Sequence, residues 1–335
     1  MAATVAPAAP DQGTASATLL DRAGATLVSL ISWIACRLPD RPLHRIAGLV
    51  GLGWYLLAPR RRARARRNLR RVAEALAADG RAGPRIAAAA RDRRALERLV
   101  RDAFRHNARY YLEVALAPSY DERWLAERIV NESPELIEEA FAGGRGAGRT
   151  PGHAVIFAGL HFGAIELPAF FLTQRVGLRV VAPMETIRDT PLQRYFVRTR
   201  GAVGLQLVTL RTARREASRA LARGEAVGLV TDRDITGGGI DVPLFGHPAP
   251  LAVGAGLLAI ESGAPVYVAA VRRLDDGRYA GSIVPLPVPA DGTRRERLER
   301  FLRDQAAIFE SFIAAAPEQW WSVFFPIWPD LEVAS

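Results

Sequence analysis

The pattern of apolar and polar positions changes near the middle of the chain. From there on, short apolar runs rich in β-branched residues alternate with segments that carry helix formers at helical spacing. The runs predict strands at residues 154–160, 178–183, 205–210, 226–231 and 266–272, with a hairpin-like strand at 279–284. The intervening and following segments predict helices at residues 163–173, 191–200, 212–222, 251–261 and 294–315. This βαβ alternation predicts an α/β fold with a largely parallel central sheet flanked by helices.

The N-terminal part has a helical pattern instead. Two apolar stretches, residues 23–36 and 46–58, flank a polar segment that contains Pro39 and Pro42, and we expect them to form a helical hairpin. Each stretch is shorter than the roughly 20 residues that span a bilayer. Amphipathic aromatic residues such as Trp33 favour a place in the membrane interface. The alternative is a hairpin that only covers the main domain.

Composition divides the chain into three expected parts. Residues 1–16 are rich in Ala, Pro, Thr and Gly, which is typical of a disordered tail. Residues 17–71 hold the apolar hairpin and an arginine-rich segment, and residues 72–330 form the main domain. The whole chain has 335 residues, which is ample for a buried core.

The charge of the chain points to anionic partners. Its formal net charge is +10, and all 45 basic residues are arginine, eight of them in residues 60–71. Beside an apolar hairpin, such a run favours anionic lipid head groups, with a solvated helix face as the alternative. No aromatic residues are interleaved with these arginines, so we expect no nucleic-acid partner. Cys36 is the single cysteine, which excludes an intramolecular disulfide and a cysteine-based zinc site.

His161 and Glu166 are the first candidates for chemistry. His161 follows the predicted strand 154–160, and ligand sites in α/β sheets lie at the carboxyl ends of strands. Five helical steps turn about 140°, so the two side chains converge only if His161 lies in a turn, which Gly163 favours. Glu166 then accepts a proton from one imidazole nitrogen, and the other nitrogen takes a proton from an alcohol. Purely structural roles for both residues are the alternative.

A second group of polar residues follows the predicted strand 226–231. Asp232, Arg233 and Asp234 end this strand at the sheet edge where His161 also lies. Arg233 can neutralise a phosphate or hold the two aspartates, and a self-contained ion cluster is the alternative. Arg272, at the end of another strand, is a weaker candidate.

These segments resemble a known family. The hexamer His161-Phe-Gly-Ala-Ile-Glu166 resembles the His-x4-Asp/Glu motif of glycerolipid-type acyltransferases. From about residue 60 to residue 328 the chain is similar to the bacterial lipid A biosynthesis acyltransferase family, which includes phosphatidylinositol mannoside acyltransferases. The segments that carry this similarity are residues 60–68, 104–113, 231–234 and 242–246.

The resemblance implies a reaction and roles for the candidates. The expected reaction moves a fatty acyl group from acyl-CoA or acyl-carrier protein to a hydroxyl of a lipid or glycolipid, without a cofactor or metal. His161 is the expected general base, Glu166 orients it and Asp232 supports it. Backbone N–H groups near Gly163 are expected to stabilise the negative charge of the attacked carbonyl. The expected substrate-binding residues are Gly163, Arg233, Asp234, Phe245, Gly246 and Arg272.

The expected location is the cytoplasmic face of the bacterial inner membrane, with peripheral or monotopic attachment to an anionic surface. The sequence does not determine the acceptor. Two other functions stay open: a catalytically inactive relative that binds lipid, and a hydrolase that uses water in place of the alcohol.

Overall fold

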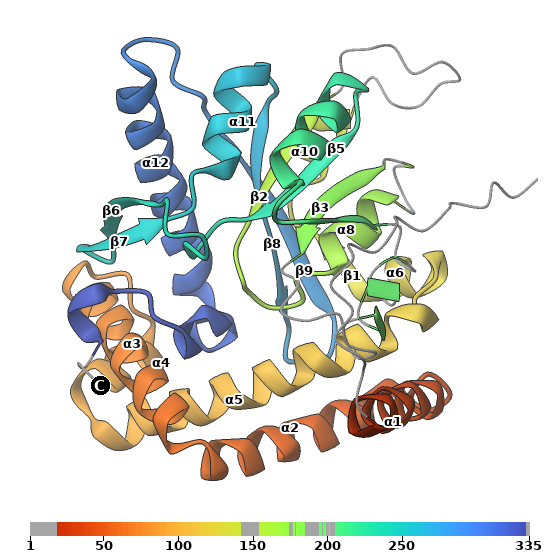
Figure 1. The fold of residues 1–335 in the computed structure, drawn as a ribbon. Coiled ribbons are helices and arrows are strands. Elements are labelled where there is room, and N and C mark those ends of the chain that lie inside the picture. The colour runs from red at the N-terminus through yellow and green to blue at the C-terminus, as the bar shows by residue number, and fades with distance from the viewer. Residues whose placement is uncertain are drawn as a thin grey trace, which may run out of the picture.

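A seven-stranded, mostly parallel sheet forms the centre of the molecule (Figure 1). The computed structural model describes residues 19–141, 154–173, 177, 179–184, 194–195, 197–198, 201 and 205–332. In spatial order the strands are β1 (Ile129–Asn131), β9 (Tyr279–Leu286), β8 (Val266–Arg273), β2 (Val155–Gly159), β5 (Ala226–Val230), β3 (Val180–Met184) and β4 (Leu205–Thr209). Among these neighbours only β8 and β9 pair antiparallel, as a hairpin. The predicted α/β class and largely parallel sheet are confirmed.

Helices cover both faces of this sheet. On one face, apolar side chains of β2, β5 and β8 pack against α10 (Ala213–Ala222), α11 (Gly254–Ser262) and α12 (Arg294–Ala315). On the other face they pack against α7 (Pro134–Phe141) and α8 (Leu167–Phe171). Both faces are therefore buried, which explains why the strands read as continuous apolar runs and not as alternating ones.

The N-terminal helices wrap the sheet's lower side in Figure 1. They are α1 (Leu19–Ala35), α2 (Asp40–Leu57), α3 (Pro59–Ala78), α4 (Pro84–Arg91), α5 (Arg93–Leu116) and α6 (Glu122–Arg128). The predicted tail, residues 1–16, lies outside the described residues. The helix α3 continues through residue 71 into the main core, where Leu69 and Val72 are buried, so the expected boundary at residue 71 falls inside a helix.

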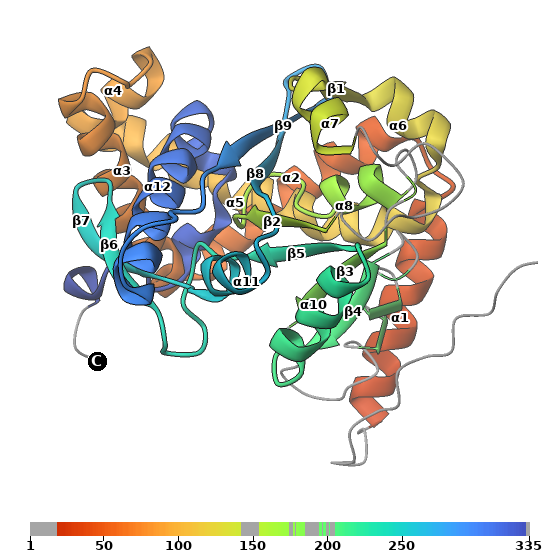
Figure 2. The same ribbon diagram turned by 90° about the horizontal axis from the view of Figure 1, so that it is seen from above.

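The two predicted apolar helices form, but they pack differently from a simple hairpin. The helix α2 lies along α5, whereas α1 leaves at a wide angle and touches the far end of α5, where Ser32 Oγ donates to the Ala115 carbonyl (Figures 1 and 2). Glycine explains the partner of α2, because a Cβ at Gly51 would lie 2.6 Å from the Phe104 carbonyl oxygen. Only a residue without a side chain allows this close approach. Among the described helices, none combines the length and the hydropathy needed to cross a bilayer.

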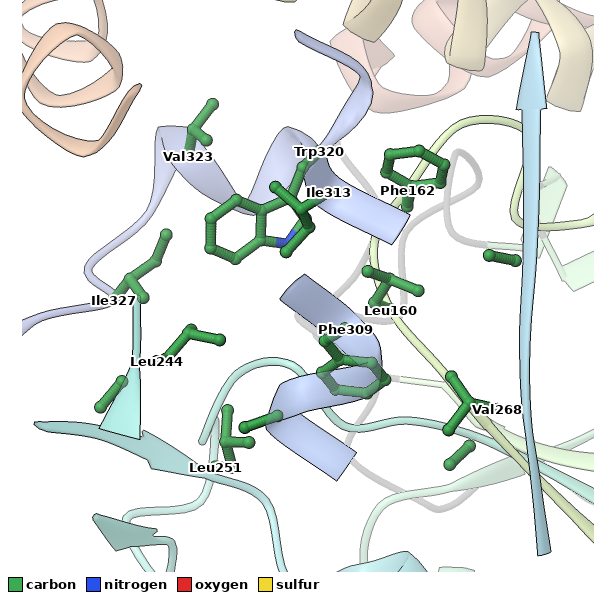
Figure 3. Packing of buried hydrophobic residues seen from close by; sticks show 14 of the residues in the cluster. Leu160, Phe162, Leu244, Leu251, Val268, Phe309, Ile313, Trp320, Val323 and Ile327 are labelled. Carbon is green, nitrogen blue, oxygen red and sulfur yellow. The ribbon is translucent and has the colours of Figure 1, made fainter. Parts of the chain in front are cut away.

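The C-terminal segment closes the core. After α12 the chain runs through three short 3₁₀ turns, Pro317–Gln319, Trp321–Phe324 and Pro329–Leu331, and buries Trp320 and Trp328 completely. A small hairpin of β6 (Ile240–Leu244) and β7 (His247–Leu251) packs on α12 and on these tryptophans. Figure 3 shows the indole of Trp320 in this core, with side chains from α12, from the hairpin and from the loop after β2 around it. The C-terminal segment is thereby held against the ends of the central strands.

Candidate active site

His161 and Asp232 meet at the carboxyl edge of the sheet. The strands β2 and β5 are parallel neighbours in which Gly159 lies opposite Val230, and each polar residue follows two positions later. The register therefore places the two side chains beside each other. His161 Nδ1 lies 2.6 Å from Asp232 Oδ1, and the His161 backbone N–H donates to Oδ2 at 3.1 Å.

The carboxylate of Asp232 is buried but well supplied with donors. Its side chain is 1% exposed, and Oδ2 also accepts from Trp320 Nε1 at 2.8 Å and from Ser322 Oγ at 2.7 Å. Burial alone raises the pKa of Asp232, but the charge and hydrogen bond of His161, with the donors of Trp320 and Ser322, outweigh it and bring the pKa to about 2. Asp232 is therefore ionised at neutral pH.

An ionised carboxylate fixes the state of the imidazole. Because it can only accept hydrogen bonds, it keeps a proton on Nδ1 of His161 and leaves Nε2 as the basic nitrogen. The ring of Trp321 meets the imidazole edge-on at a centroid distance of 4.4 Å, and Trp321 also stacks on Tyr110 at 4.7 Å. The imidazole is thus held on one edge by Asp232 and against one side by Trp321, with 13% of its side chain exposed. This arrangement can accept a proton from a hydroxyl group.

Glu166 lies at the N-terminal end of α8, where its Oε1 accepts from Tyr110 Oη at 3.3 Å. The contact to Nδ1 that the spacing suggested for Glu166 is made by Asp232. A catalytic role for Glu166 stays a prediction.

Gly163 holds the loop after His161 in place through its backbone. Its φ is +52°, and a Cβ would lie 1.9 Å from the Val271 carbonyl oxygen. The Gly163 N–H donates to the Gln319 carbonyl at 3.0 Å. The Ala164 N–H donates to the Val271 carbonyl, also at 3.0 Å. In this structure the N–H groups of Gly163 and Ala164 thus both have acceptors within the protein, and the expected role of N–H groups near Gly163 in stabilising a negative charge stays a prediction.

A buried ion pair between Arg273 and Glu113 also contacts the loop that follows His161. Arg273, the last residue of β8, donates from Nε and Nη2 to the two oxygens of Glu113 on α5, both at 2.5 Å. Its Nη2 also donates to the Gly163 carbonyl at 2.9 Å, and the Gln319 side chain bonds both the N–H and the carbonyl of Arg273. The sequence pointed to Arg272 instead, but that side chain faces outward and pairs with Glu132 at 2.5 Å. The structure does not bring Arg272 to His161.

The remaining candidates have structural contacts. Arg233 places its guanidinium 3.9 Å over the ring of Phe325. Asp234 accepts from the N–H groups of Thr236, Gly237 and Gly239, and so closes the glycine loop that follows it.

Phe245 and Gly246 form the turn of the β6–β7 hairpin, with φ of +50° and +75°. Phe245 is 3% exposed and packs near Trp320 and Trp328. The structure thus gives Asp234, Phe245 and Gly246 structural contacts in a loop, in the core and in a turn, and their expected role in substrate binding stays a prediction.

An apolar cavity of about 40 Å³ lies between α8 and the strands β2, β8 and β9. Its walls include Phe157, Leu167, Phe171, Ala269 and Ile283. Leu167, the first residue of α8, directly follows Glu166 in the chain and is one of the residues that line this cavity. Among the described residues, no group of His, Cys, Asp and Glu side chains is arranged to hold a metal ion.

Comparisons with known proteins place the chain in a family. A model of the family described as bacterial lipid A biosynthesis acyltransferase matches residues 12–324, and the chain belongs to this family. It is 29% identical over 162 residues to a phosphatidylinositol mannoside acyltransferase of Mycobacterium tuberculosis, over 47% of this chain and 48% of that protein. It is 28% identical over 174 residues to the protein of that name from Mycolicibacterium smegmatis, over 50% of this chain and 54% of that one. The matches thus span about half the length of these curated relatives.

Proposed function

We propose that this protein is an O-acyltransferase that moves a fatty acyl group from a thioester to a hydroxyl of a lipid or glycolipid. The observation that carries the proposal is the His161–Asp232 pair at the sheet edge, in a chain of the lipid A biosynthesis acyltransferase family. The names of the mycobacterial relatives favour a glycosylated phospholipid as the acceptor. Acyl-CoA or acyl-carrier protein is the proposed donor.

The reaction needs no covalent acyl-enzyme. Nε2 of His161 takes the proton of the acceptor hydroxyl as its oxygen attacks the thioester carbonyl. The C–O bond forms, the C–S bond breaks, and the imidazolium returns the proton to the departing thiolate. Asp232 stabilises the imidazolium through Nδ1, as a buried aspartate does in the serine hydrolase triad. Glu166 is proposed to hold the loop beside the base.

The acyl chain is proposed to enter the apolar cavity under α8. Its volume of about 40 Å³ leaves room for only a few water molecules, since one water needs about 10–15 Å³ on the same measure. Binding of a full chain therefore requires α8 to move away from the strands. Apolar side chains of α8 and of the strands form the walls of the cavity on that side, including Leu167, Phe171 and Ile283.

Attachment to a membrane is proposed for α1 and α2. Eleven of the sixteen large apolar side chains that are exposed among the described residues lie between residues 27 and 57. A soluble monomer rarely exposes so continuous an apolar surface. The adjoining arginines of α3 add attraction to anionic lipids, which supports peripheral or monotopic binding at the cytoplasmic face of the inner membrane.

The test uses acyl-CoA or acyl-carrier protein with a labelled acyl chain, incubated with the protein and a bacterial lipid extract. Label in a lipid product supports acyl transfer, label in free fatty acid supports a hydrolase, and unchanged thioester supports an inactive lipid-binding relative. In the first case His161→Ala should lower the rate on the order of 10²–10⁴-fold, the usual worth of a general base. A folded His161→Ala protein with a normal rate would exclude the proposed base.

A further inference from the structure

A basic hollow is lined by side chains from the end of α2, the start of α3 and the start of α5. These helix ends lie in the lower left part of Figure 1. The volume of the hollow is about 700 Å³, within the range of pockets that hold small ligands. Eight residues line it, namely Tyr55, Arg62, Arg66, Arg93, Arg94, Glu97, Arg98 and Arg101. One carboxylate thus faces six guanidinium groups.

The carboxylate of Glu97 accepts hydrogen bonds from two other residues of the hollow, Arg66 and Tyr55. Glu97 accepts from Arg66 Nε at 2.7 Å and Nη2 at 3.1 Å, and also from Tyr55 Oη. Burial raises the pKa of Glu97, but the hydrogen bonds of Arg66 and Tyr55 outweigh it and lower that pKa. Glu97 therefore holds Arg66 in place, and the charge of Arg101 also lowers the pKa of Glu97, so this one carboxylate is shared among several arginines.

The remaining arginines keep their charge without a carboxylate partner. Within the described part of the chain, Arg62, Arg93, Arg94, Arg98 and Arg101 have no acidic group at ion-pair distance. Arg94, Arg98 and Arg101 follow one exposed face of α5 at steps of four and three residues, so their charges lie close together. Like charges at these steps destabilise a helix, so an anion in the hollow would relieve a real repulsion.

The surroundings favour a ligand that lies at a membrane surface. Leu56 and Leu57, at the end of α2 beside Tyr55, are among the most exposed apolar side chains of the protein, Leu57 at 85%. Tyr110, which contacts Glu166, is nine residues beyond Arg101, or on the order of 14 Å along α5, and the lining of the hollow includes neither His161 nor Asp232. It is separate from the place where the acyl group would be transferred.

We propose that this hollow binds the phosphate group of an anionic lipid headgroup while the neighbouring apolar end of α2 contacts the acyl region of the same membrane. A phosphomonoester suits several converging guanidinium groups, since it offers three acceptor oxygens and up to two negative charges. The hollow is a concave site that eight side chains line. A small phosphate headgroup can enter such a site, whereas the convex surface of a helix on an acidic protein cannot. The inference deepens the proposed membrane attachment and rests on it.

The test compares the full-length protein with Arg94→Gln/Arg98→Gln in binding to phosphatidylcholine vesicles that contain either phosphatidic acid or a charge-matched amount of phosphatidylserine. The unchanged protein should prefer phosphatidic acid. The double variant should lose that preference, with binding weaker on the order of 10- to 30-fold from two lost charge contacts. Arg70→Gln/Arg91→Gln is the matched control, because both side chains are exposed, outside the hollow and without an ion pair in the described structure.

Several results would overturn the proposal. Equal losses in both double variants would mean that only the overall charge matters. Thermal protection by inorganic phosphate, with vesicle binding unaffected by the substitutions, would assign the hollow to a soluble phosphate. Loss of binding to acyl-carrier protein alone would assign it to that protein. Acyl transfer in detergent solution is measured in parallel. If the protein showed no acyl transfer but still preferred vesicles with phosphatidic acid, the proposed reaction would be excluded and the phosphate site would stand.

Discussion

At the scale of single residues, Asp232 combines burial with full ionisation. Four donors surround its two oxygens: the N–H and Nδ1 of His161, Nε1 of Trp320 and Oγ of Ser322. Hydrogen bonds to a charged group in a site of low dielectric constant are strong, which is why they offset the burial. The orientation of His161 therefore depends on this one carboxylate.

This dependence predicts different effects of the two acidic residues. Asp232→Asn keeps the shape but removes the charge that stabilises the imidazolium, so kcat should fall on the order of 10²–10⁴-fold. Glu166→Gln should cost at least tenfold less, because Glu166 does not occupy Nδ1. Steady-state kinetics of both variants, with circular dichroism as a control for folding, measure the difference. An equal or larger loss in Glu166→Gln would return the orienting role to Glu166.

The lowered pKa of Asp232 also predicts a pH dependence of stability. A carboxyl group whose pKa falls on folding stabilises the native state above its unfolded pKa, and this stabilisation is lost as the pH falls toward the folded pKa. Here the pKa falls from 3.8 to about 2. The total contribution is about 2 kcal/mol, of which about 1 kcal/mol should be lost between about pH 6 and about pH 3.

Urea unfolding at a series of pH values measures this contribution. The free energy of unfolding of the unchanged protein should fall more steeply with acid than that of Asp232→Asn. Parallel curves for the two proteins would show that Asp232 has the same pKa in the folded and unfolded states.

The sequence singled out His161 and Asp232, which the structure brings together, because each directly follows an apolar run; the role predicted for Glu166 stays a prediction. It did not identify Trp320, Ser322 or the pair of Arg273 and Glu113. Trp320 is 88 residues from Asp232, and Glu113 is 160 residues from Arg273. Such contacts are set by how the C-terminal segment and α5 pack on the sheet, and no local pattern records them. Glu113 ends the segment 104–113 that resembled the family, which was the only signal for it.

At the scale of elements, the turn between β2 and α8 joins the sheet to the active site. Its conformation depends on Gly163, which has a positive φ and lies against the backbone of β8. A side chain there meets two separate obstacles, a strained φ and a carbonyl oxygen at 1.9 Å. Neither can be relieved without moving His161 relative to Asp232.

Gly163→Ala is therefore expected to lower the free energy of unfolding by about 3 kcal/mol or more. Gly263→Ala is the matched control, because Gly263 has a φ of +67° but no atom within 4 Å of the added Cβ. In Gly263→Ala the free energy of unfolding should fall only by the cost of the strained φ, about 1 kcal/mol. Chemical denaturation of both variants measures the two costs, and equal losses would mean that the contact with Val271 yields easily.

The sequence predicted the strands β2, β3, β4, β5, β8 and β9 of the central sheet but not the β6–β7 hairpin. Proline at positions 243, 248 and 250 interrupts that segment, and proline ordinarily argues against a strand. Here the hairpin is separate from the central sheet, so its strands have free edges that tolerate proline. The pairing of α2 with α5 was also missed, because apolar periodicity shows that a helix face is buried without naming its partner.

At the scale of the whole molecule, charge and apolar surface gather on the same side. Among the described residues, most of the large apolar side chains that are exposed lie on α1 and α2. The arginines of α3 and of the basic hollow adjoin these helices. Each feature alone is compatible with a soluble protein. Together they give a surface with both the hydrophobic and the electrostatic contributions that interfacial membrane binding requires.

This arrangement predicts which contribution dominates. Leu49 and Val50 on α2 are 67% and 61% exposed, so Leu49→Ser/Val50→Ser should leave the fold intact. Burying an apolar side chain contributes about 1.5–3 kcal/mol when complete, so partial insertion of two predicts a loss of vesicle binding on the order of 10- to 100-fold. Since this loss is hydrophobic, it should persist at high salt, whereas the contribution of the arginines should be screened.

Vesicle co-sedimentation at low and high salt measures both contributions, with Ile235→Ser as the control for an exposed apolar residue outside α1 and α2. Size-exclusion chromatography of the same proteins tests the competing explanation, in which a second copy of the chain covers α1 and α2. If Leu49→Ser/Val50→Ser changed the oligomeric state and left vesicle binding unaltered, the apolar surface would be a protein interface. The membrane would then have to be reached through the arginines alone, and binding would disappear at high salt for every variant.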